Sequence, residues 1–339
     1  AEFKASGAKI RLLGWPRTLG TIAFIQALAK IFQAKSPYIV HVQYMAPGLL
    51  PIIAAKLARV PLVAATVHYP GTPHGFVAHL LLRFGAFLTD CFTCVSEAAE
   101  KSWFGNSLLI DLEKPTDFSG RRHLTIPNAL DVDAIDNALA TELPRVIETA
   151  LKLEGKIIVG TVARLSREKG IDNLLKAFAS IKKKIPQSHL LIVGDGDQRD
   201  ILQSLARQLG IDNSITWMGQ LSWAEAVKCM SLMHVVIVPS RFEGFGLTAV
   251  EAMACGKPVA ASNVDGLSEI IEEGVSGFLI NSEDSMAFAE TATALLKDEK
   301  RRKEIGISAR RRVAQKYSYL LYLKRVKALY GMFLGSTEI

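Results

Sequence analysis

The sequence predicts an α/β protein built from two doubly wound domains. Apolar, β-branched runs alternate with stretches of helical periodicity, and this alternation occurs in both halves of the chain. The length of 339 residues is typical of about two domains that each bury a core of their own. We expect residues 1–145 to form the first domain and residues 146–316 the second. Residues 317–339 are expected to form a C-terminal helix that either stays with the second domain or crosses back to the first.

Composition excludes several classes of protein. Hydrophobic residues make up 49% of the chain and charged residues 22%, which excludes a disordered, collagen-like or coiled-coil chain. The longest uncharged stretch, residues 36–55, is interrupted by three prolines and therefore predicts a strand, a loop and a helix start, not a membrane span. No secretory leader is recognisable at the start of the sequence. We expect a cytoplasmic location, with the inner face of the membrane as the alternative.

The first half contains five predicted strands with helices between them. The strands are Ile10–Leu13, Tyr38–Val42, Leu62–Val67, Cys91–Val95 and His123–Ile126, and the helices are Ile22–Phe32, Leu49–Leu57, Phe76–Phe87 and Glu97–Trp103. Cys91 and Cys94 have the spacing of a metal or redox pair, but residues three apart in a strand point to opposite faces, so we interpret them as buried thiols. Residues 131–154 have few strand signals and are interpreted as the connection between the domains.

The second half repeats the alternation more clearly. Its predicted strands are Ile157–Val162, Leu190–Val193, Ile215–Met218, Val235–Val238, Pro258–Ala261 and Phe278–Ile280. These runs are apolar throughout, as expected for parallel strands that helices cover on both faces. Ligands of such sheets bind beyond the carboxyl ends of the strands, so the residues that follow each strand are the candidates for a site.

Two candidate motifs follow the first two strands of this half. Arg164 and Lys169 come after the first strand and precede an amphipathic helix, where an arginine fork and a lysine charge can neutralise a diphosphate. Gly194 and Gly196 come after the second strand and permit either close approach to a ligand or a tight turn. Arg199 occupies the place of the last glycine in a dinucleotide fingerprint, which disfavours a nicotinamide cofactor.

The most informative stretch is residues 238–258. A buried strand ends near Pro239, a glycine-rich loop carries Glu243, and a helix is predicted from about Leu247 to Cys255. Backbone amides at the start of that helix form an anion site. Glu251 lies about one turn further on, where its carboxylate can accept hydrogen bonds from the hydroxyl groups of a ribose. As alternatives, the two acids are an ordinary loop residue and a helix-capping residue.

At this point the sequence resembles a known family, the retaining GT-B glycosyltransferases of family GT4, also called glycosyl transferases group 1. The motifs that carry the resemblance are the Glu-x7-Glu pair Glu243 and Glu251, Arg164 with Lys169-Gly170, Gly194-Asp-Gly196, Pro239-Ser240 and Gly266-Leu-Ser-Glu269. Looser matches precede them at Thr66-Val67-His68, Val95-Ser96-Glu97 and Ile126-Pro-Asn128. The motifs occur in the family's order over the whole second half. The resemblance implies two Rossmann-like domains that face a cleft.

The resemblance also implies roles for individual residues. Arg164 and Lys169 would bind the donor diphosphate, Glu251 the ribose and Glu243 the hydroxyl groups of the donor sugar. The backbone amides of Phe245, Gly246 and Leu247, together with Gly194, would complete the donor site. His68 would face the transferred sugar, or else have only a structural role. Glu243, His68, Arg164 and Lys169 are therefore the candidate catalytic residues.

The activity implied is transfer of a hexosyl group from a UDP- or GDP-linked sugar to a hydroxyl group of a glycan or lipid-linked acceptor, with retention of configuration. We expect no cofactor and no metal, because Arg164 and Lys169 already supply positive charge; the acidic pairs Asp131/Asp133 and Asp195/Asp197 are the metal-binding alternatives. The expected partners are the nucleotide-sugar, the acceptor and a membrane surface, and no nucleic acid. A non-catalytic donor-binding subunit and a nicotinamide-dependent oxidoreductase are the competing functions.

The sequence departs from the family in two places. Family members usually begin with a strand followed by a Gly-Gly loop, but residues 8–13 align better with a later strand, so we expect an incomplete first domain with an altered acceptor site, in a fragment or in a naturally short member. The family often has a second glycine where Asp265 precedes Gly266, and Asp265 is expected to adjust donor preference.

Positive charge is concentrated near the end of the chain. Residues 301–330 contain ten basic residues and one acidic residue, Glu304. We interpret this run as the solvated face of terminal helices, with contact to anionic lipid as the alternative. No aromatic-plus-basic motif accompanies it, which disfavours nucleic-acid binding.

Overall fold

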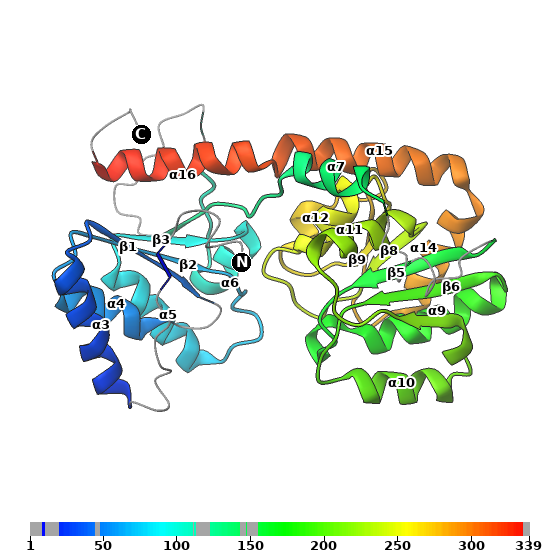
Figure 1. Ribbon diagram of the computed structural model, residues 1–339, viewed down its shortest axis with the longest axis horizontal. Helices are drawn as coiled ribbons and strands as arrows, with labels where there is room; N and C mark the ends of the chain where they lie inside the picture. Colours follow the sequence, from blue (N-terminus) through cyan, green and yellow to red (C-terminus); the bar gives the residue numbers. More distant parts are fainter. Residues whose placement is uncertain are drawn as a thin grey trace. The chain divides into compact units, whose positions relative to one another are not determined.

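The computed structural model describes residues 9–10, 20–44, 48–110, 112, 123–142, 147 and 155–334. These residues belong to two compact units (Figure 1). Unit 1 comprises Ala1–Val67, His74–Thr93 and Phe118–His123, and unit 2 comprises His68–Pro73, Cys94–Asp117 and Leu124–Ile339. This division differs from the expected boundaries at residues 145 and 316, because residues 68–73, 94–117 and 124–145 of the expected first domain, and residues 317–339, are grouped with the second unit.

Four strands of the first half form one sheet in the order β1-β2-β3-β4. They are β1 (Ile39–Tyr44), β2 (Leu62–Val67), β3 (Cys91–Cys94) and β4 (His123–Thr125), and the helices of this half are α3 (Thr21–Lys35), α4 (Leu49–Leu57), α5 (Phe76–Leu88) and α6 (Glu97–Phe104). β1 and β2 are parallel, as the alternation predicts. The predicted strand Ile10–Leu13 is not tested, since residues 11–13 lie outside the described residues and residue 10 is not in a strand.

Six parallel strands form the sheet of the second half, in the order β10-β9-β8-β5-β6-β7. They are β5 (Ile157–Val162), β6 (Ser188–Val193), β7 (Ile215–Trp217), β8 (Val235–Val238), β9 (Val259–Ser262) and β10 (Phe278–Ile280). The six predicted strands are thus confirmed to within two residues. The fold class, an α/β protein with two parallel sheets, is confirmed as well.

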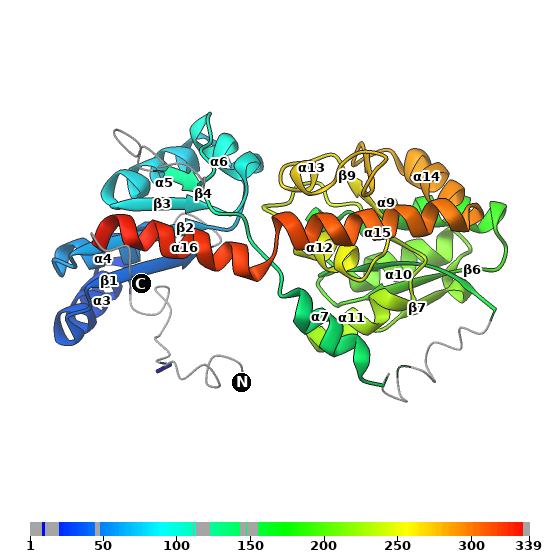
Figure 2. The ribbon, with the colours of Figure 1, turned by 90° about the horizontal axis from the view of Figure 1, so that it is seen from above.

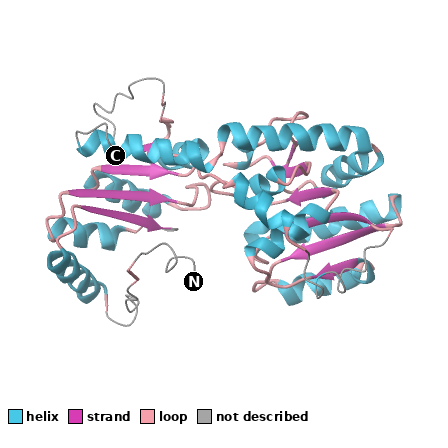
Figure 3. Ribbon diagram, turned by 45° about the horizontal axis from the view of Figure 1, so that its top comes forward, coloured by secondary structure: helices cyan, strands magenta, loops and turns pink. Residues whose placement is uncertain are grey.

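Helices cover both faces of the six-stranded sheet (Figures 1 and 3). They are α7 (Val132–Ala140), α9 (Ile171–Lys184), α10 (Arg199–Gln208), α11 (Trp223–Leu232), α12 (Leu247–Ala254), α13 (Leu267–Ile270), α14 (Ser285–Lys297) and α15 (Glu299–Lys316). The last helix, α16 (Tyr319–Leu334), follows α15 along the chain. Alternate side chains of β8 enter different hydrophobic clusters: Val236 packs with residues of α11 and α12, and Ile237 packs with residues of α9 and α14. This two-sided burial explains why the strands are apolar throughout.

The segment interpreted as a connection, residues 131–154, contains the helix α7. Asp131 caps its start, since its carboxylate accepts a hydrogen bond of 3.1 Å from the amide of Ala134. Ile135 and Ala138 are buried in the cluster that α11 and α12 form. The segment was interpreted as a connection because it has few strand signals, although half of its residues are apolar.

The basic run in residues 301–330 is not only a solvated face. Within unit 2, Arg310 donates to both carboxylate oxygens of Asp136 at 2.7 Å and to the carbonyl of Ala254, and Arg312 donates to Glu272 at 2.8 Å. α15 also lies alongside α12 (Figure 2). Part of the positive charge therefore holds helices and loops of unit 2 together. Among the described residues, no helix is both long and apolar enough to cross a membrane.

Candidate functional site

A cavity of about 390 Å³ lies at the carboxyl ends of β5 and β6 in unit 2. It is lined by Val162, Ala163, Arg164, Val193, Gly194, Asp195, Gln220, Leu221, Ala226 and Thr248. Arg164 and Gly194 were predicted from the sequence, and Thr248 belongs to the first turn of α12. The cavity is therefore found at the sheet edge where parallel α/β folds bind ligands.

Gly194 allows the turn after β6 to lie directly against the loop after β5. It has a φ of 125°, and a Cβ atom added there would lie 1.9 Å from the carbonyl oxygen of Ala163. The amide of Leu165, the residue after Arg164, donates to the carbonyl of Asp195 at 3.0 Å. This hydrogen bond joins the loop after β5 to the turn after β6. Arg199, in the place of a third glycine, pairs with Asp195 at 2.8 Å. The glycine turn thus positions the backbone that carries Arg164.

The structure brings Lys169 and Glu243 together. The Lys169 ammonium lies 2.7 Å from the Glu243 carboxylate, and their side chains are only 23% and 17% exposed. The Ser240 hydroxyl donates to the same carboxylate oxygen at 3.1 Å. Gly170, which follows Lys169, lies against the end of β8. A Cβ atom added to Gly170 would lie 2.0 Å from the carbonyl oxygen of Pro239. Two motifs far apart in the sequence therefore form one charged cluster.

Arg164 takes a different position. Its side chain is 59% exposed and lies 3.2 Å from the Glu168 carboxylate. No described residue other than Glu168 is hydrogen-bonded to its guanidinium group. Arg164 therefore borders the cavity with most of its hydrogen-bond donors unused.

His68 reaches the Glu243 loop through its backbone. A Cβ atom on Gly244 would lie 2.0 Å from the carbonyl oxygen of His68, so that only glycine fits there. The Ser96 hydroxyl donates to the carbonyl of Gly244 at 2.6 Å. All of these residues belong to unit 2. Burial lowers the pKa of His68, so its imidazole is neutral at neutral pH.

Asp265 is a second anchor of this loop. Its carboxylate accepts hydrogen bonds from the Thr72 hydroxyl at 2.7 Å and from the amide of Glu243 at 3.2 Å. Its φ of 36° explains why a glycine is common at this point of the family's pattern. Burial raises the pKa of Asp265. The expected role in donor preference is untested, but the geometry gives Asp265 a role in holding Glu243.

Glu269 is engaged by the start of α6. Its carboxylate accepts hydrogen bonds from the amides of Glu97, at 3.1 Å, and Ala98, while Ser96 caps the same helix. A carboxylate at a helix N-terminus is favoured by the helix dipole. This residue of the family motif therefore has a structural contact in unit 2.

The start of α12 offers hydrogen-bond donors that have no protein partner. Gly246 caps the helix with a φ of 110°, and no side chain caps it. Among the described residues, no acceptor is hydrogen-bonded to the backbone amides of residues 245–248. The Phe245 ring is only 4% exposed and packs edge-on against Tyr317 at 5.5 Å, whereas Leu247 is 44% exposed. Because its ring is buried, Phe245 offers a ligand its backbone amide and not its side chain. Free amides at a helix start are suited to binding an anion.

Glu251 lies one turn into α12 and has a partner that the sequence did not indicate. The indole N–H of Trp223 donates to one of its carboxylate oxygens at 2.8 Å. Burial raises the pKa of Glu251. Ser222 and Glu225 form a capping box at the start of α11, but no local signal indicates that the adjacent indole reaches α12. Gln220 and Thr248 were likewise missed, because loop and helix residues of these types are common.

Candidate metal ligands are engaged elsewhere. Asp131 caps α7, Asp195 pairs with Arg199, and Asp197 accepts a hydrogen bond of 3.1 Å from Gln198. Within the described part of the chain, no group of three or more His, Cys, Asp or Glu residues is placed to hold a metal ion. Cys91 and Cys94 are buried, as interpreted from the sequence. Metal independence stays a prediction.

Family models match both halves of the chain. The model for glycosyl transferases group 1 matches residues 145–312, and the model for Glycosyltransferase Family 4 matches residues 5–105. Together these ranges contain every predicted site residue. The first range includes the cavity, the Lys169–Glu243 pair and α12.

Individual relatives agree with these matches. The uncharacterized glycosyltransferase MJ1607 of Methanocaldococcus jannaschii is 36% identical over 47% of this chain and 40% of its own length. The N-acetyl-alpha-D-glucosaminyl L-malate synthase of Bacillus anthracis is 26% identical over 91% of this chain and 78% of its own length. The crystal structure of Anabaena Alr3699/HepE in complex with UDP and glucose aligns with a TM-score of 0.78 at 22% identity, over 98% of this chain and 88% of that one. This last similarity establishes the fold.

Proposed function

Because this chain belongs to the GT4 glycosyltransferases, which have the GT-B fold, we propose that it transfers a hexosyl group from a UDP- or GDP-sugar to a hydroxyl group of a glycan or lipid-linked acceptor. Transfer proceeds with retention of the anomeric configuration. The observation that carries the proposal is the Lys169–Glu243 pair, 2.7 Å apart, in the same compact unit as the unpartnered amides of α12. This combination suits a substrate that has both an anionic diphosphate and a hydroxyl-bearing sugar.

Each proposed role follows from the chemistry of the group. Negative charge builds on the diphosphate as its bond to the sugar breaks, so Arg164, Lys169 and the helix-end amides stabilise the transition state more than the ground state. Glu251 accepts hydrogen bonds from the ribose, and Glu243 from the hydroxyl groups of the sugar. Neutral His68 lies near the sugar. A UDP complex of the structurally similar HepE supports a nucleoside diphosphate as the donor group.

A thermal-shift panel tests the donor class. The panel contains UDP, GDP, ADP, their sugar conjugates and NAD, and a ligand at about 100 times its Kd stabilises a protein by roughly 2.7 kcal/mol. We expect a selective shift with UDP or GDP and with its sugar conjugate. A shift with NAD alone would favour an oxidoreductase. Donor binding without transfer to any hydroxyl acceptor would favour a non-catalytic subunit, and the anomeric configuration of a product tests retention.

Chelation tests the predicted independence of metals. We expect EDTA to leave the transfer rate unchanged, because Arg164 and Lys169 supply the positive charge that a divalent ion would otherwise supply at the diphosphate. The rate is measured at saturating donor before and after chelation. Activity that EDTA abolishes and that Mg²⁺ or Mn²⁺ restores would contradict the prediction.

We also propose that α5 attaches unit 1 to a membrane surface on the cytoplasmic side. Six large apolar side chains of this helix are exposed: Phe76, Val77, Leu80, Leu81, Phe84 and Phe87. Helices with such an apolar face bind the interface between headgroups and acyl chains. The replacements Phe76→Ser and Phe84→Ser together are expected to lower co-sedimentation with anionic lipid vesicles about tenfold.

Ile201→Ser is the matched control for this membrane prediction. Ile201 is also an exposed apolar residue, at 62%, but it lies on α10 of unit 2. We expect this variant to co-sediment like the unmodified protein. Equal co-sedimentation of the α5 variant and the control would exclude α5 as the attachment surface.

A further inference from the structure

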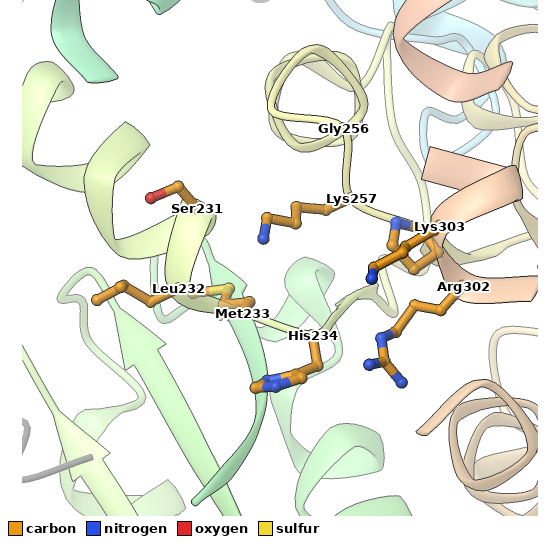
Figure 4. A pocket seen from close by; sticks show the side chains of 9 residues that line it. Ser231, Leu232, Met233, His234, Gly256, Lys257, Arg302 and Lys303 are labelled. Atoms are coloured by element: carbon orange, nitrogen blue, oxygen red, sulfur yellow. The ribbon is translucent and has the colours of Figure 1, made fainter. Parts of the chain in front are cut away.

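A second cavity of about 390 Å³ lies at the opposite edge of the six-stranded sheet (Figure 4). It is lined by Ser231, Leu232, Met233, His234, Gly256, Lys257, Pro258, Arg302 and Lys303. His234 directly precedes β8, and Pro258 directly precedes β9. Because the strands are parallel, these amino ends face away from the edge that carries Arg164 and Thr248. The proposed donor site does not account for this basic cavity.

Lys257 is the central positive charge of the cavity. It is half-buried, and among the described residues its ammonium group has no hydrogen-bond or ion-pair partner. Burial lowers the pKa of Lys257, and the nearby positive charge of Arg302 also lowers it. Figure 4 shows its side chain extending from the segment after Gly256 into the space between α11 and α15. A half-buried cation without a partner is costly unless something binds it.

Arg302 supplies a fixed second charge. Its Nη1 donates to the carbonyls of Leu295 and Leu296 at 3.0 and 3.2 Å, which anchors the guanidinium at the end of α14 and leaves Nε and Nη2 available. Lys303 is different, because it is 72% exposed and lies 2.6 Å from Glu299. Its charge is therefore largely compensated, and it borders the cavity without being a strong ligand.

His234 adds a neutral donor. The amide of Ile158 donates to its Nδ1 at 3.0 Å, so the ring proton of the neutral imidazole is on Nε2. Burial, together with the charges of Arg302 and Lys257, lowers the pKa of His234 and keeps the ring neutral. Figure 4 shows the ring on the same side of the cavity as β8. Its Nε2–H is therefore free of the backbone contact that fixes the ring.

The backbone around the cavity is closely packed. A Cβ atom on Gly306 would lie 2.0 Å from the carbonyl oxygen of Gly256, so α15 touches the chain directly after α12. Gly306 follows Arg302 by one helical turn, which places both residues on the same face of α15. This contact fixes Arg302 relative to Lys257. The cations are thus held by the fold and are not on flexible surface loops.

We propose that this cavity binds the phosphate group of a small phosphorylated molecule, with Lys257 and the free donors of Arg302 and His234 as its ligands. Two cations and a neutral N–H donor match a phosphate dianion in charge and in hydrogen bonding. The volume is large enough for a sugar phosphate or a molecule of similar size. No carboxylate belongs to the described lining of the cavity, and Glu299, the acid that interacts with His234 and Arg302, is paired with Lys303. The inference does not depend on the proposed donor or acceptor.

If Arg302 and Lys257 had only a structural function, a different result would be expected. Arg302 donates hydrogen bonds to carbonyls at the end of α14. Lys257 follows the end of α12, where the helix dipole stabilises a positive charge. If that were their whole function, phosphate would not bind saturably. Acetylation of lysines, followed residue by residue by mass spectrometry, distinguishes the two functions. Inorganic phosphate is the probe, and chloride at equal ionic strength controls for screening.

The test uses the Lys169→Met background, which weakens phosphate binding at the proposed donor site. We expect phosphate to protect Lys257 with a single midpoint. Arg302→Met should raise that midpoint about tenfold or more. The matched control Lys303→Met should leave it within about twofold, because Lys303 is paired with Glu299. Melting temperatures confirm that each variant is folded.

Three results would overturn the proposal. The first is a Lys257 that phosphate does not protect, and the second is an equal effect of the Arg302 and Lys303 replacements. The third is protection only by vesicles that contain phosphatidic acid, which would indicate a lipid headgroup and not a small molecule. Saturable protection in both the Lys169→Met background and the unmodified protein would support a site separate from the donor cavity.

Discussion

Replacing Lys169 with methionine is expected to lower kcat/KM for transfer about 10²–10³-fold. Two effects add to each other. The variant removes a cation that we propose stabilises the departing diphosphate, and it leaves the Glu243 carboxylate, 17% exposed and otherwise 2.7 Å from the ammonium, without its ionic partner. Initial rates with the donor identified by thermal shift give the measurement.

Two further variants make this result specific. Glu243→Gln keeps the shape of the side chain and removes its charge, so a double-mutant cycle with Lys169→Met measures the coupling of the pair. Lys183→Met replaces an exposed lysine of α9 and is expected to transfer at the normal rate. A Lys169→Met protein that melts and transfers like the unmodified protein would contradict the site assignment.

The part of the fold that the sequence predicts best is the six-stranded sheet. β5, β8 and β10 have the predicted ends, because a short apolar run bounded by polar or turn-forming residues has few alternatives in a parallel sheet. The helix α7 was missed because its burial depends on Ile135 and Ala138, which fit a surface that residues distant in the sequence create.

The candidate site was likewise predicted only in part. Lys169, Glu243 and Glu251 are recognisable because each occupies a fixed place after a strand or within a helix start. Their partners are not recognisable, since Trp223 reaches Glu251 across 28 residues and Thr72 reaches Asp265 across 193 residues. Hydrogen bonds between segments so far apart leave no local pattern. Motifs therefore identify the candidate ligand-binding groups better than the groups that hold them.

The support of the cavity by Gly194 leads to a prediction about stability. Gly194→Ala is expected to lower the free energy of unfolding by about 2–5 kcal/mol, from about 1–2 kcal/mol for a side chain at positive φ and about 1–3 kcal/mol for overpacking. The new Cβ would lie 1.9 Å from the carbonyl oxygen of Ala163, which is backbone and cannot rotate away. Urea unfolding with a common m-value measures the difference.

Gly210→Ala separates the two contributions. Gly210 also has a positive φ, 67°, but nothing lies within 4 Å of an added Cβ, so only the conformational cost of about 1 kcal/mol is expected. The Gly194 variant should also bind the donor more weakly. A displaced turn strains the hydrogen bond of 3.0 Å from the amide of Leu165 to the carbonyl of Asp195, which lies beside Arg164. Equal unfolding energies for the two variants would mean that the turn after β6 does not hold the Arg164 loop. In that case a loss of donor binding in the Gly194 variant would need another cause.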